Sequence, residues 1–312
     1  MRRVPLPCLL FWKGAVMNSS KLGAQSSKIN NDIQSENSRE RVGLNELKIV
    51  IKGAGEMASG VAHRLYMAGM RNILMMEMPE PLSVRRMVSF CEAIFEGNVE
   101  VEGVRAEFIQ HVEGARSAWE KHNIAVLVDP QWKSIGVIKP HVVVDATMVK
   151  RNLGTKKDEA PLVIGVGPGF KTGDDVHIVI ESNRGHDLGR TIYEGAAEPY
   201  TGIPGQMMAY TKERVLRAHA AGRVKHMRVL GDSVKSGDPV LTVDNIPLLA
   251  PIDGILRGLI REISVVKDEK VGDIDPRGKL EYCHTISDKA RAIGGGVLEA
   301  IMHVYNRPAP IM

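Results

Sequence analysis

The chain has 312 residues, of which 44% are hydrophobic and 25% charged, with a net charge of +4, 4% aromatic residues and three cysteines. This composition excludes a disordered or fibrous protein, a disulfide scaffold and a base-stacking platform for nucleic acid, and no run of eighteen apolar residues could span a membrane. We expect a cytoplasmic protein of about two domains, without nucleic-acid or membrane partners.

The first 46 residues differ from the rest. Residues 1–16 contain two arginines and then a short apolar run, but Pro5 and Pro7 interrupt it and no small-residue cleavage site follows. The alternatives to a signal peptide are a loosely ordered leader and an upstream start codon with Met17 as the true start. Residues 18–46 are polar and aperiodic, so we predict a disordered leader over residues 1–46 that carries no chemistry.

Residues 47–77 have the pattern of a dinucleotide-binding unit. A buried strand over 47–51 precedes the G-x-G-x-x-A motif of Gly53, Gly55 and Ala58, which opens a helix ending near Gly69. The next strand ends at Glu77, 22 residues after Gly55, where an acid can contact a ribose hydroxyl. The pattern predicts binding of a phosphate-bearing cofactor, with NAD(P) as one candidate. The alternative is a tight turn that binds nothing, and the carboxylate of Glu56 within the loop favours it.

Further elements continue an α/β pattern to residue 214. We predict helices over 82–95 and 112–122, a hairpin over 99–109, and strands over 124–128, 142–144, 162–166 and 176–180. Asp129 and Asp145 end two of these strands, where open α/β sheets bind ligands, although such an Asp more often caps a turn.

Polar residues and glycines are dense between residues 148 and 205. Four clusters follow strand ends there, and their cations could form charge-assisted bonds to a polyanionic ligand. The alternative is a set of solvated turns. The candidate cofactor-binding residues are Lys150, Arg151, Asn152, Gly167, Gly169, Arg184, His186, Asp187 and Arg190. We assign no metal, because His177 and His186 lack partners at ligand spacing.

Residues 215–277 contain an approximate internal repeat of short strands and turns. The repeat resembles biotinyl and lipoyl carrier domains and predicts a small all-β barrel-sandwich hybrid. The hairpin over 243–247 lacks the lysine that carriers modify. We therefore interpret this domain as a structural cover or a docking module.

Residues 278–306 form a predicted helix that packs back onto the first domain, with Ser287 as its N-cap. Gly294, Gly295 and Gly296 within the helix cost about 1 kcal/mol each relative to alanine. Either close packing against another backbone or a ligand on the helix would explain them, so we count them as candidate cofactor-binding residues. Cys283 lies near Arg277 and His284, which predicts either a nucleophilic thiolate with a lowered pKa or an inert buried thiol.

Taken together, the motifs resemble a known family. Seven strings of rare residue types occur in order: IKGAGEMASGVAHRLYMAG, MVKRNLGT, VIGVGPGF, ESNRGHDLGR, TGIPG, GDIDPRG and YCHTISDKARAIGGGVLEA. They are similar to those of selenium-dependent molybdenum hydroxylase system proteins of the YqeB type, over residues 48–301.

This resemblance implies an accessory role in maturing selenium-dependent molybdenum hydroxylases. The implied ligand is a molybdopterin-type cofactor, the implied partner is the client hydroxylase, and Cys283 would carry sulfur or selenium. Two other functions stay open: an NAD(P)-dependent oxidoreductase, and a non-catalytic scaffold that docks the hydroxylase. A homo-oligomer is compatible with each.

Overall fold

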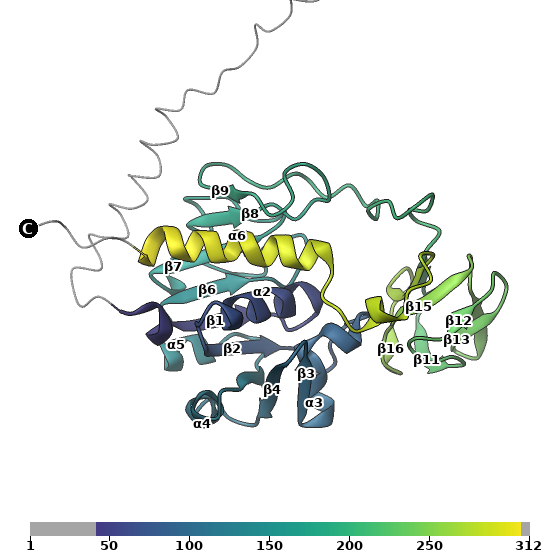
Figure 1. Cartoon of the computed structure of the whole chain (residues 1–312), viewed down its shortest axis with the longest axis horizontal. Helices are drawn as coiled ribbons and strands as arrows, with labels where there is room; N and C mark the ends of the chain where they lie inside the picture. Colours follow the sequence, from purple (N-terminus) through teal and green to yellow (C-terminus); the bar gives the residue numbers. More distant parts are fainter. Residues whose placement is uncertain (1–41, 307–312) are drawn as a thin grey trace, which may run out of the picture.

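The computed structural model describes residues 42–306, which form one large α/β unit and one smaller all-β unit (Figure 1). Most of the predicted leader, residues 1–41, lies outside the described residues. The expectation of disorder as far as residue 46 is wrong for its last part. There η1 (Leu44–Glu46) forms a 3-10 turn, and Val42 and Leu44 pack against the core because they are apolar.

A nine-stranded sheet runs through the larger unit in the order β3-β4-β5-β2-β1-β6-β7-β8-β9. The edge strands β3 and β9 are antiparallel to their neighbours, and the other pairs are parallel. The strands are β1 (Lys48–Lys52), β2 (Asn72–Glu77), β3 (Asn98–Val101), β4 (Val104–Ile109), β5 (Ile124–Val128), β6 (Val142–Asp145), β7 (Leu162–Val166), β8 (Ile178–Ile180) and β9 (Thr191–Ile192). The runs of Val, Ile and Leu in the inner strands suit strands that are buried on both faces.

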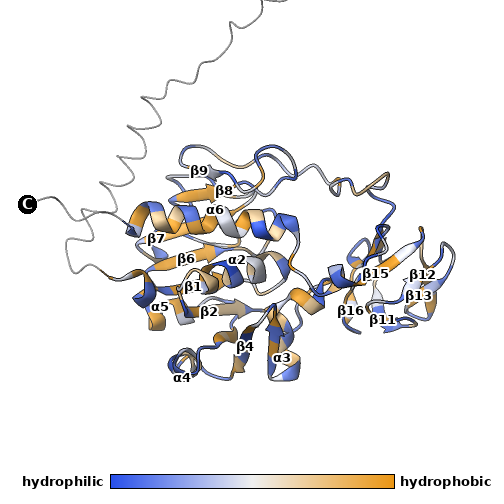
Figure 2. Ribbon diagram, viewed as in Figure 1, coloured by the Kyte–Doolittle hydropathy of each residue, from blue (hydrophilic) through white to orange (hydrophobic). Residues whose placement is uncertain are grey.

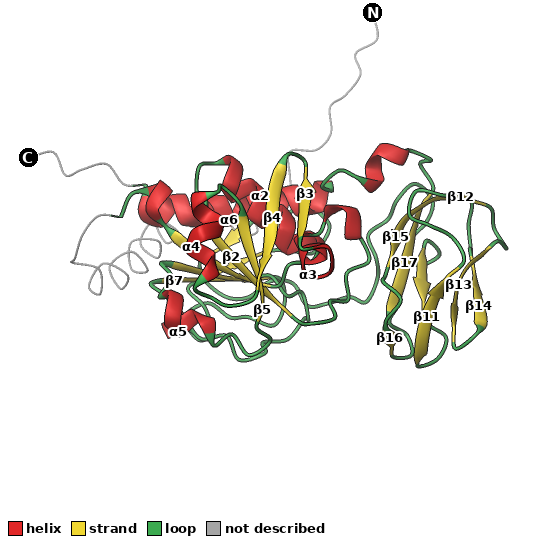
Figure 3. Ribbon diagram, turned by 90° about the horizontal axis from the view of Figure 1, so that it is seen from below, coloured by secondary structure: helices red, strands yellow, loops and turns green. Residues whose placement is uncertain are grey.

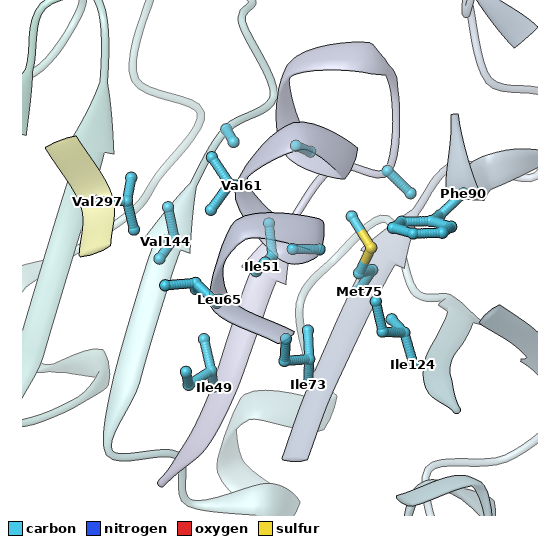
Figure 4. Close-up of a cluster of buried hydrophobic side chains, with 14 of the residues drawn as sticks. Ile49, Ile51, Val61, Leu65, Ile73, Met75, Phe90, Ile124, Val144 and Val297 are labelled. Carbon is cyan, nitrogen blue, oxygen red and sulfur yellow. The ribbon is translucent and has the colours of Figure 1, made fainter. Parts of the chain in front are cut away.

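Helices cover both faces of this sheet. Ile49 and Ile51 of β1 point into a core formed with α2 (Glu56–Met67) and α6 (Asp288–Tyr305), and Figure 4 shows this cluster together with Val61, Leu65 and Val297. The alternate residue, Val50, faces a second core with α4 (Gly114–Glu120) and α5 (Ser134–Ile138). Figure 3 shows α5 on the face opposite α2 and α6, and Figure 2 shows the apolar strands between these layers.

The predicted helix over 82–95 is wrong. The chain there forms η2 (Arg86–Val88), η3 (Phe90–Glu92) and the short α3 (Ala93–Glu96). The cause is a tertiary contact, because this segment packs against the smaller unit: the Leu259 N–H donates to the Val84 carbonyl at 2.8 Å. The hairpin over 99–109 and the strands after it are confirmed to within a few residues.

The smaller unit contains two four-stranded antiparallel sheets, ordered β10-β17-β15-β12 and β14-β13-β11-β16. One apolar core lies between them, and Val84 of the larger unit contributes to it. The strands are β10 (Val215–Arg217), β11 (Gly222–His226), β12 (Ser233–Val234), β13 (Pro239–Val243), β14 (Ile246–Leu249), β15 (Gly254–Leu259), β16 (Ser264–Val265) and β17 (Lys270–Asp275). Asp244 and Asn245 form the predicted hairpin turn, both with positive φ.

After β17 the chain returns through η5 (Leu280–Cys283) to α6, which lies along α2 in front of the sheet (Figure 1). The predicted return of the last helix onto the first unit is seen here. Within residues 42–306, no helix is long and apolar enough to cross a membrane.

Candidate functional site

Two neighbouring strands, β1 and β6, define where a ligand could lie. The chain proceeds from β1 to β2 on one side and later returns to β6 on the other. Loops that leave such a pair diverge, and open α/β sheets bind ligands at the resulting crevice outside the carboxyl ends of the strands. The Gly53–Gly55 loop follows β1, and the loop over 146–152, which includes Lys150, follows β6.

The Gly53–Gly55 loop is a tight strand-to-helix turn. Gly53 has a φ of +94°, and a Cβ there would lie 3.2 Å from the Ala146 carbonyl oxygen in the loop after β6. Gly55 is the N-cap of α2 and provides no side-chain cap, while Ala58 is buried in the first turns of the helix. The N-terminal end of α2 thus presents backbone N–H groups without a side-chain acceptor, which favours an anion.

Glu77 binds this loop from the end of β2. One carboxylate oxygen accepts the Ala54 N–H at 2.7 Å and the other accepts the Met78 N–H at 2.8 Å. Burial raises the pKa of Glu77, and the two backbone hydrogen bonds oppose that rise. The residue therefore holds the glycine loop in place, and each oxygen keeps one further lone pair.

Glu56 does not face the loop as an uncompensated charge. Its carboxylate pairs at 3.1 Å with the buried guanidinium of Arg85. Arg85 also donates to the carbonyl oxygens of Tyr282 (2.8 Å) and Thr285 (3.1 Å). This pairing removes the main electrostatic objection to an anion at the start of α2.

Lys150 and Lys289 are the cations at this edge that most need a counter-ion. Burial, together with the positive charge of Lys289, lowers the pKa of Lys150 to about 8. Burial also lowers the pKa of Lys289, and nearby Arg184 adds to this effect. Among the described residues, neither ammonium group forms an ion pair, although Lys150 lies 5.8 Å from the ring of Tyr200. Two partly buried ammonium groups without an ion pair favour an anionic ligand, although Glu56 and Glu181 partly offset the charge of Lys289.

The other predicted cations are paired or exposed. Arg184 binds both carboxylate oxygens of Asp288 at 2.5 and 3.1 Å, and Arg190 pairs with Asp187 at 3.1 Å. Arg151 and His186 are exposed. These residues could reach a ligand only by exchanging or extending their present contacts.

Asn152 organises its own loop. Its side-chain oxygen accepts the N–H groups of Gly154 (2.8 Å) and Thr155 (2.7 Å), and its amide donates to Asp175 at 3.1 Å. With both ends of the amide engaged, Asn152 shapes the chain beside Lys150.

Gly167 and Gly169, in the turn after β7, allow two chain segments to approach closely. A Cβ on Gly167 would overlap the Ser182 hydroxyl, and one on Gly169 would lie 2.7 Å from the Arg151 Cα. Both glycines also have positive φ. Chain packing alone accounts for them.

Packing likewise explains two of the three helix glycines. A Cβ on Gly294 would lie 2.9 Å from the Gly60 carbonyl oxygen of α2, and one on Gly296 would overlap the Gly189 carbonyl oxygen. At Gly295 a Cβ would meet nothing within 4 Å. The first of the two sequence-based explanations, close backbone packing, therefore holds for Gly294 and Gly296.

Of the two alternatives for Cys283, the surroundings favour the inert buried thiol. The thiol is buried at the end of η5, and this burial raises its pKa. Arg85 and Arg257 oppose the rise but do not reverse it. Cys283 also lies five residues before α6 begins, outside the influence of that helix N-terminus. The thiol is therefore protonated near neutral pH.

Sequence reasoning missed Lys289 and Arg85 as members of the site. A signal for Lys289 was available, because Ser287 accepts the Ala290 N–H and this cap fixes Lys289 in the first turn of α6. For Arg85 the only signal was its position in a segment wrongly predicted as helix. Its role depends on Glu56 and on backbone near residue 283, contacts that chain spacing does not show.

The fold and these two ammonium groups define an α/β protein with an anion-attracting edge beside a glycine-rich turn. No protein-family model matches the chain. The chain is 48% identical to the Escherichia coli K12 "Uncharacterized protein YqeB" over 260 residues, which cover 83% of this chain and 48% of that protein. This similarity supports the YqeB-type resemblance, and the chain spans about half the length of this curated relative.

Two solved structures share little with the chain. "TcdA (CsdL)" is 13% identical with a TM-score of 0.22, over 58% of this chain and 69% of its own. An aspartoacylase family protein from Mesorhizobium loti is 12% identical with a TM-score of 0.24, over 73% and 84%. Such low scores indicate neither a common fold nor a common function.

Proposed function

We propose that this protein is an accessory factor for the maturation of selenium-dependent molybdenum hydroxylases, and that it binds the phosphate group of a molybdopterin-type cofactor. The supporting observation is the pair of partly buried ammonium groups without an ion pair, Lys150 and Lys289, at the β1–β6 crevice. The ordered motifs of the YqeB type point to the pathway.

The finer fold assignment belongs to the same proposal. The larger unit is Rossmann-like, since parallel strands reverse their order at β1 and β6 with helices on both faces. The smaller unit is a barrel-sandwich hybrid of the biotinyl and lipoyl type, since two antiparallel sheets with a central hairpin enclose one core.

The residues present fit the phosphate end of such a cofactor. Lys150 and Lys289 supply positive charge, and the uncapped start of α2 supplies backbone N–H donors. Glu77 orients the donor loop through Ala54, and Arg85 neutralises Glu56. When bound, the cofactor supplies the dithiolene sulfurs that hold molybdenum. The protein binds and orients it, and the client hydroxylase uses it.

Cys283 stands outside this binding site in our proposal. Its thiol is buried and its raised pKa disfavours the thiolate. A role as a sulfur or selenium carrier therefore draws no support from its surroundings.

The test uses the full chain purified from cells that make molybdopterin. Mass spectrometry of the released small molecules is expected to detect a molybdopterin-type compound or its oxidation product. Lys150→Met and Lys289→Met are expected to lower its amount about tenfold, as loss of a charge-assisted phosphate bond predicts. The matched control Lys267→Met removes an exposed lysine of the smaller unit and should retain the wild-type amount.

Equal retention of the compound by all three variants would overturn the assigned site. Absence of any pterin from the folded wild-type protein would overturn the proposed function.

One observation favours a second candidate function, an NAD(P)-dependent oxidoreductase: the glycine turn of Gly53 and Gly55 followed by Glu77 at the next strand end. Titration with NADH, followed by its fluorescence, separates the two. Saturable binding that Glu77→Gln weakens would support the oxidoreductase, and no binding at millimolar NADH would remove it.

A further inference from the structure

The side chain of Lys52 carries a buried charge that the proposed function does not use. Lys52 is the last residue of β1 and is fully buried. Its side chain lies on the sheet face away from α2, where its ammonium is 5.5 Å from the ring centre of Trp132. Burying an ammonium group costs free energy unless it is paired, so its partners matter.

Three polar side chains surround this ammonium. It donates to both carboxylate oxygens of Glu159, at 2.8 and 2.7 Å, and to the Thr155 hydroxyl at 2.7 Å. That hydroxyl in turn donates to the buried carboxylate of Asp145 at 2.6 Å. One positive charge thus faces two negative charges, so the cluster carries a net charge of −1 when its groups are ionised.

A pocket of about 500 Å³ adjoins this cluster. Its walls come from the loop after β5 with α5, and from the loop after β6 with η4 (Lys157–Glu159), at the carboxyl edge where open α/β sheets bind ligands. Its volume is within the range of small-molecule sites, about 300–1,000 Å³. The lining residues are Pro130, Gln131, Trp132, Ile135, Gly136, Leu153, Gly154 and Glu159.

Two side chains give the pocket its chemistry. Glu159 belongs to both the cluster and the pocket, and its side chain is 17% exposed. Each of its oxygens accepts one hydrogen bond from Lys52 and keeps another lone pair for a ligand. Trp132 contributes an indole wall and is held at a φ of +58°, a conformation that costs free energy for a bulky residue and is often found at ligand sites.

Charge and shape together select the ligand. An excess negative charge with free acceptor lone pairs favours a group that donates hydrogen bonds, and the indole of Trp132 favours a planar ring. We propose that this pocket binds a planar nitrogen heterocycle with an amino group, whose N–H donors bond to Glu159 and whose ring packs on Trp132.

The pocket differs in charge from the proposed phosphate site, although Lys52 and Asp145 end the same two strands, β1 and β6. Lys150 and Lys289 attract an anion, whereas the cluster of Lys52, Asp145 and Glu159 repels one. A neutral heterocycle without phosphate therefore tests this pocket alone.

The experiment titrates guanosine into the full chain by isothermal calorimetry. We expect saturable binding, weakened about tenfold or more by Glu159→Gln because a neutral amide replaces the charged acceptor. Glu113→Gln, an exposed carboxylate in a different surface groove, is the matched control and should bind as wild type. Lys150→Met should also leave guanosine binding unchanged.

Glu159→Gln removes the charged partner of Lys52 and could prevent folding. A second variant therefore tests the pocket without changing this ion pair. Gly136 lines the pocket, and a Cβ there would meet nothing within 4 Å, so Gly136→Met fills the space without a clash. It should remove guanosine binding while the melting temperature stays near that of wild type.

Three results would each overturn the proposal: no guanosine binding at millimolar concentration, wild-type affinity in the folded Gly136→Met protein, or tighter binding of the aliphatic 1,5-diaminopentane at the same pocket. The last would assign the pocket to amines without a ring.

Discussion

The carbonyl oxygen of Gly189 lies so close to the Cα of Gly296 that a Cβ at this position of α6 would overlap it. The loop before β9 and the last described helix therefore meet backbone to backbone. Gly296→Ala must push the loop or the helix away. We expect the free energy of unfolding to fall by about 1–3 kcal/mol, as for other overpacked sites, measured by urea denaturation.

The neighbouring residue gives the control. The Cβ added by Gly295→Ala meets no atom within 4 Å, and alanine has the higher helix propensity. The free energy of unfolding should therefore rise by up to ~1 kcal/mol. If both variants change stability in the same direction, the backbone contact at Gly296 is not the reason for the glycine.

Thr155 joins two buried charges through one hydroxyl, since it accepts from Lys52 and donates to Asp145. Thr155→Val keeps the shape and removes both hydrogen bonds. We expect a loss of about 2–3 kcal/mol in the free energy of unfolding, because hydrogen bonds to buried charged groups are the stronger ones. Thr155→Ser keeps the hydroxyl and should lose less than half as much. Equal losses would show that the methyl group matters rather than the hydroxyl.

Lys150 makes stability depend on pH. Its pKa is about 8 in the folded protein and 10.5 ordinarily, so between these values the unfolded chain binds more protons. The contribution of Lys150 to the free energy of unfolding therefore rises as the pH increases from about 8 to about 10.5. At pH 7 the full cost of burying the charged ammonium group is present, and Lys150→Met should be more stable than wild type.

The measurement is the difference in unfolding free energy between wild type and Lys150→Met across pH 7 to 11. The difference should approach zero above pH 10.5, and Lys156→Met, at an exposed position of the next loop, should show no such trend. A difference that stays constant with pH would mean that the ammonium is well solvated.

Cys283 should react slowly with iodoacetamide in the native protein. The reaction needs an accessible thiolate, and this thiol is buried with a raised pKa. Mass spectrometry of the peptide containing Cys283 should show labelling at least tenfold slower than in urea at pH 7.5. Fast native labelling would restore the nucleophilic thiolate expected from the sequence.

Most inner strands of the larger unit could be predicted because they are continuous apolar runs, as at Ile49–Ile51 and Val142–Val144, whereas the two-residue edge strand β9 was not predicted. Such runs depend on local composition alone. The segment over 82–95 has helical spacing too, but its structure is decided by Leu259 and Arg261 of the smaller unit, which bond to Val84 and Glu92. A local sequence pattern contains no information about a contact with residues so far along the chain.

The candidate site could be predicted in part for the same reason. Lys150 and the Gly53 turn follow strand ends, and the strands place them at one edge. Lys289 joins them only because α6 returns to α2, and the burial of Cys283 depends on contact between the two units. The charged pair of Arg184 was also invisible to spacing, since Asp288 comes from a distant helix.

The position of α6 has a consequence for synthesis of the protein. Ala290, Ile293 and Val297 of this helix complete the core around α2, yet they are translated after the whole smaller unit. As the chain leaves the ribosome, the part of the first core that α6 later covers stays exposed beside α2 while β10 to β17 are made. Val84 is by then already available to the core of the smaller unit. The order of translation therefore lets the second unit fold to completion first, and a ribosome stalled before residue 288 would leave the first unit exposed to aggregation.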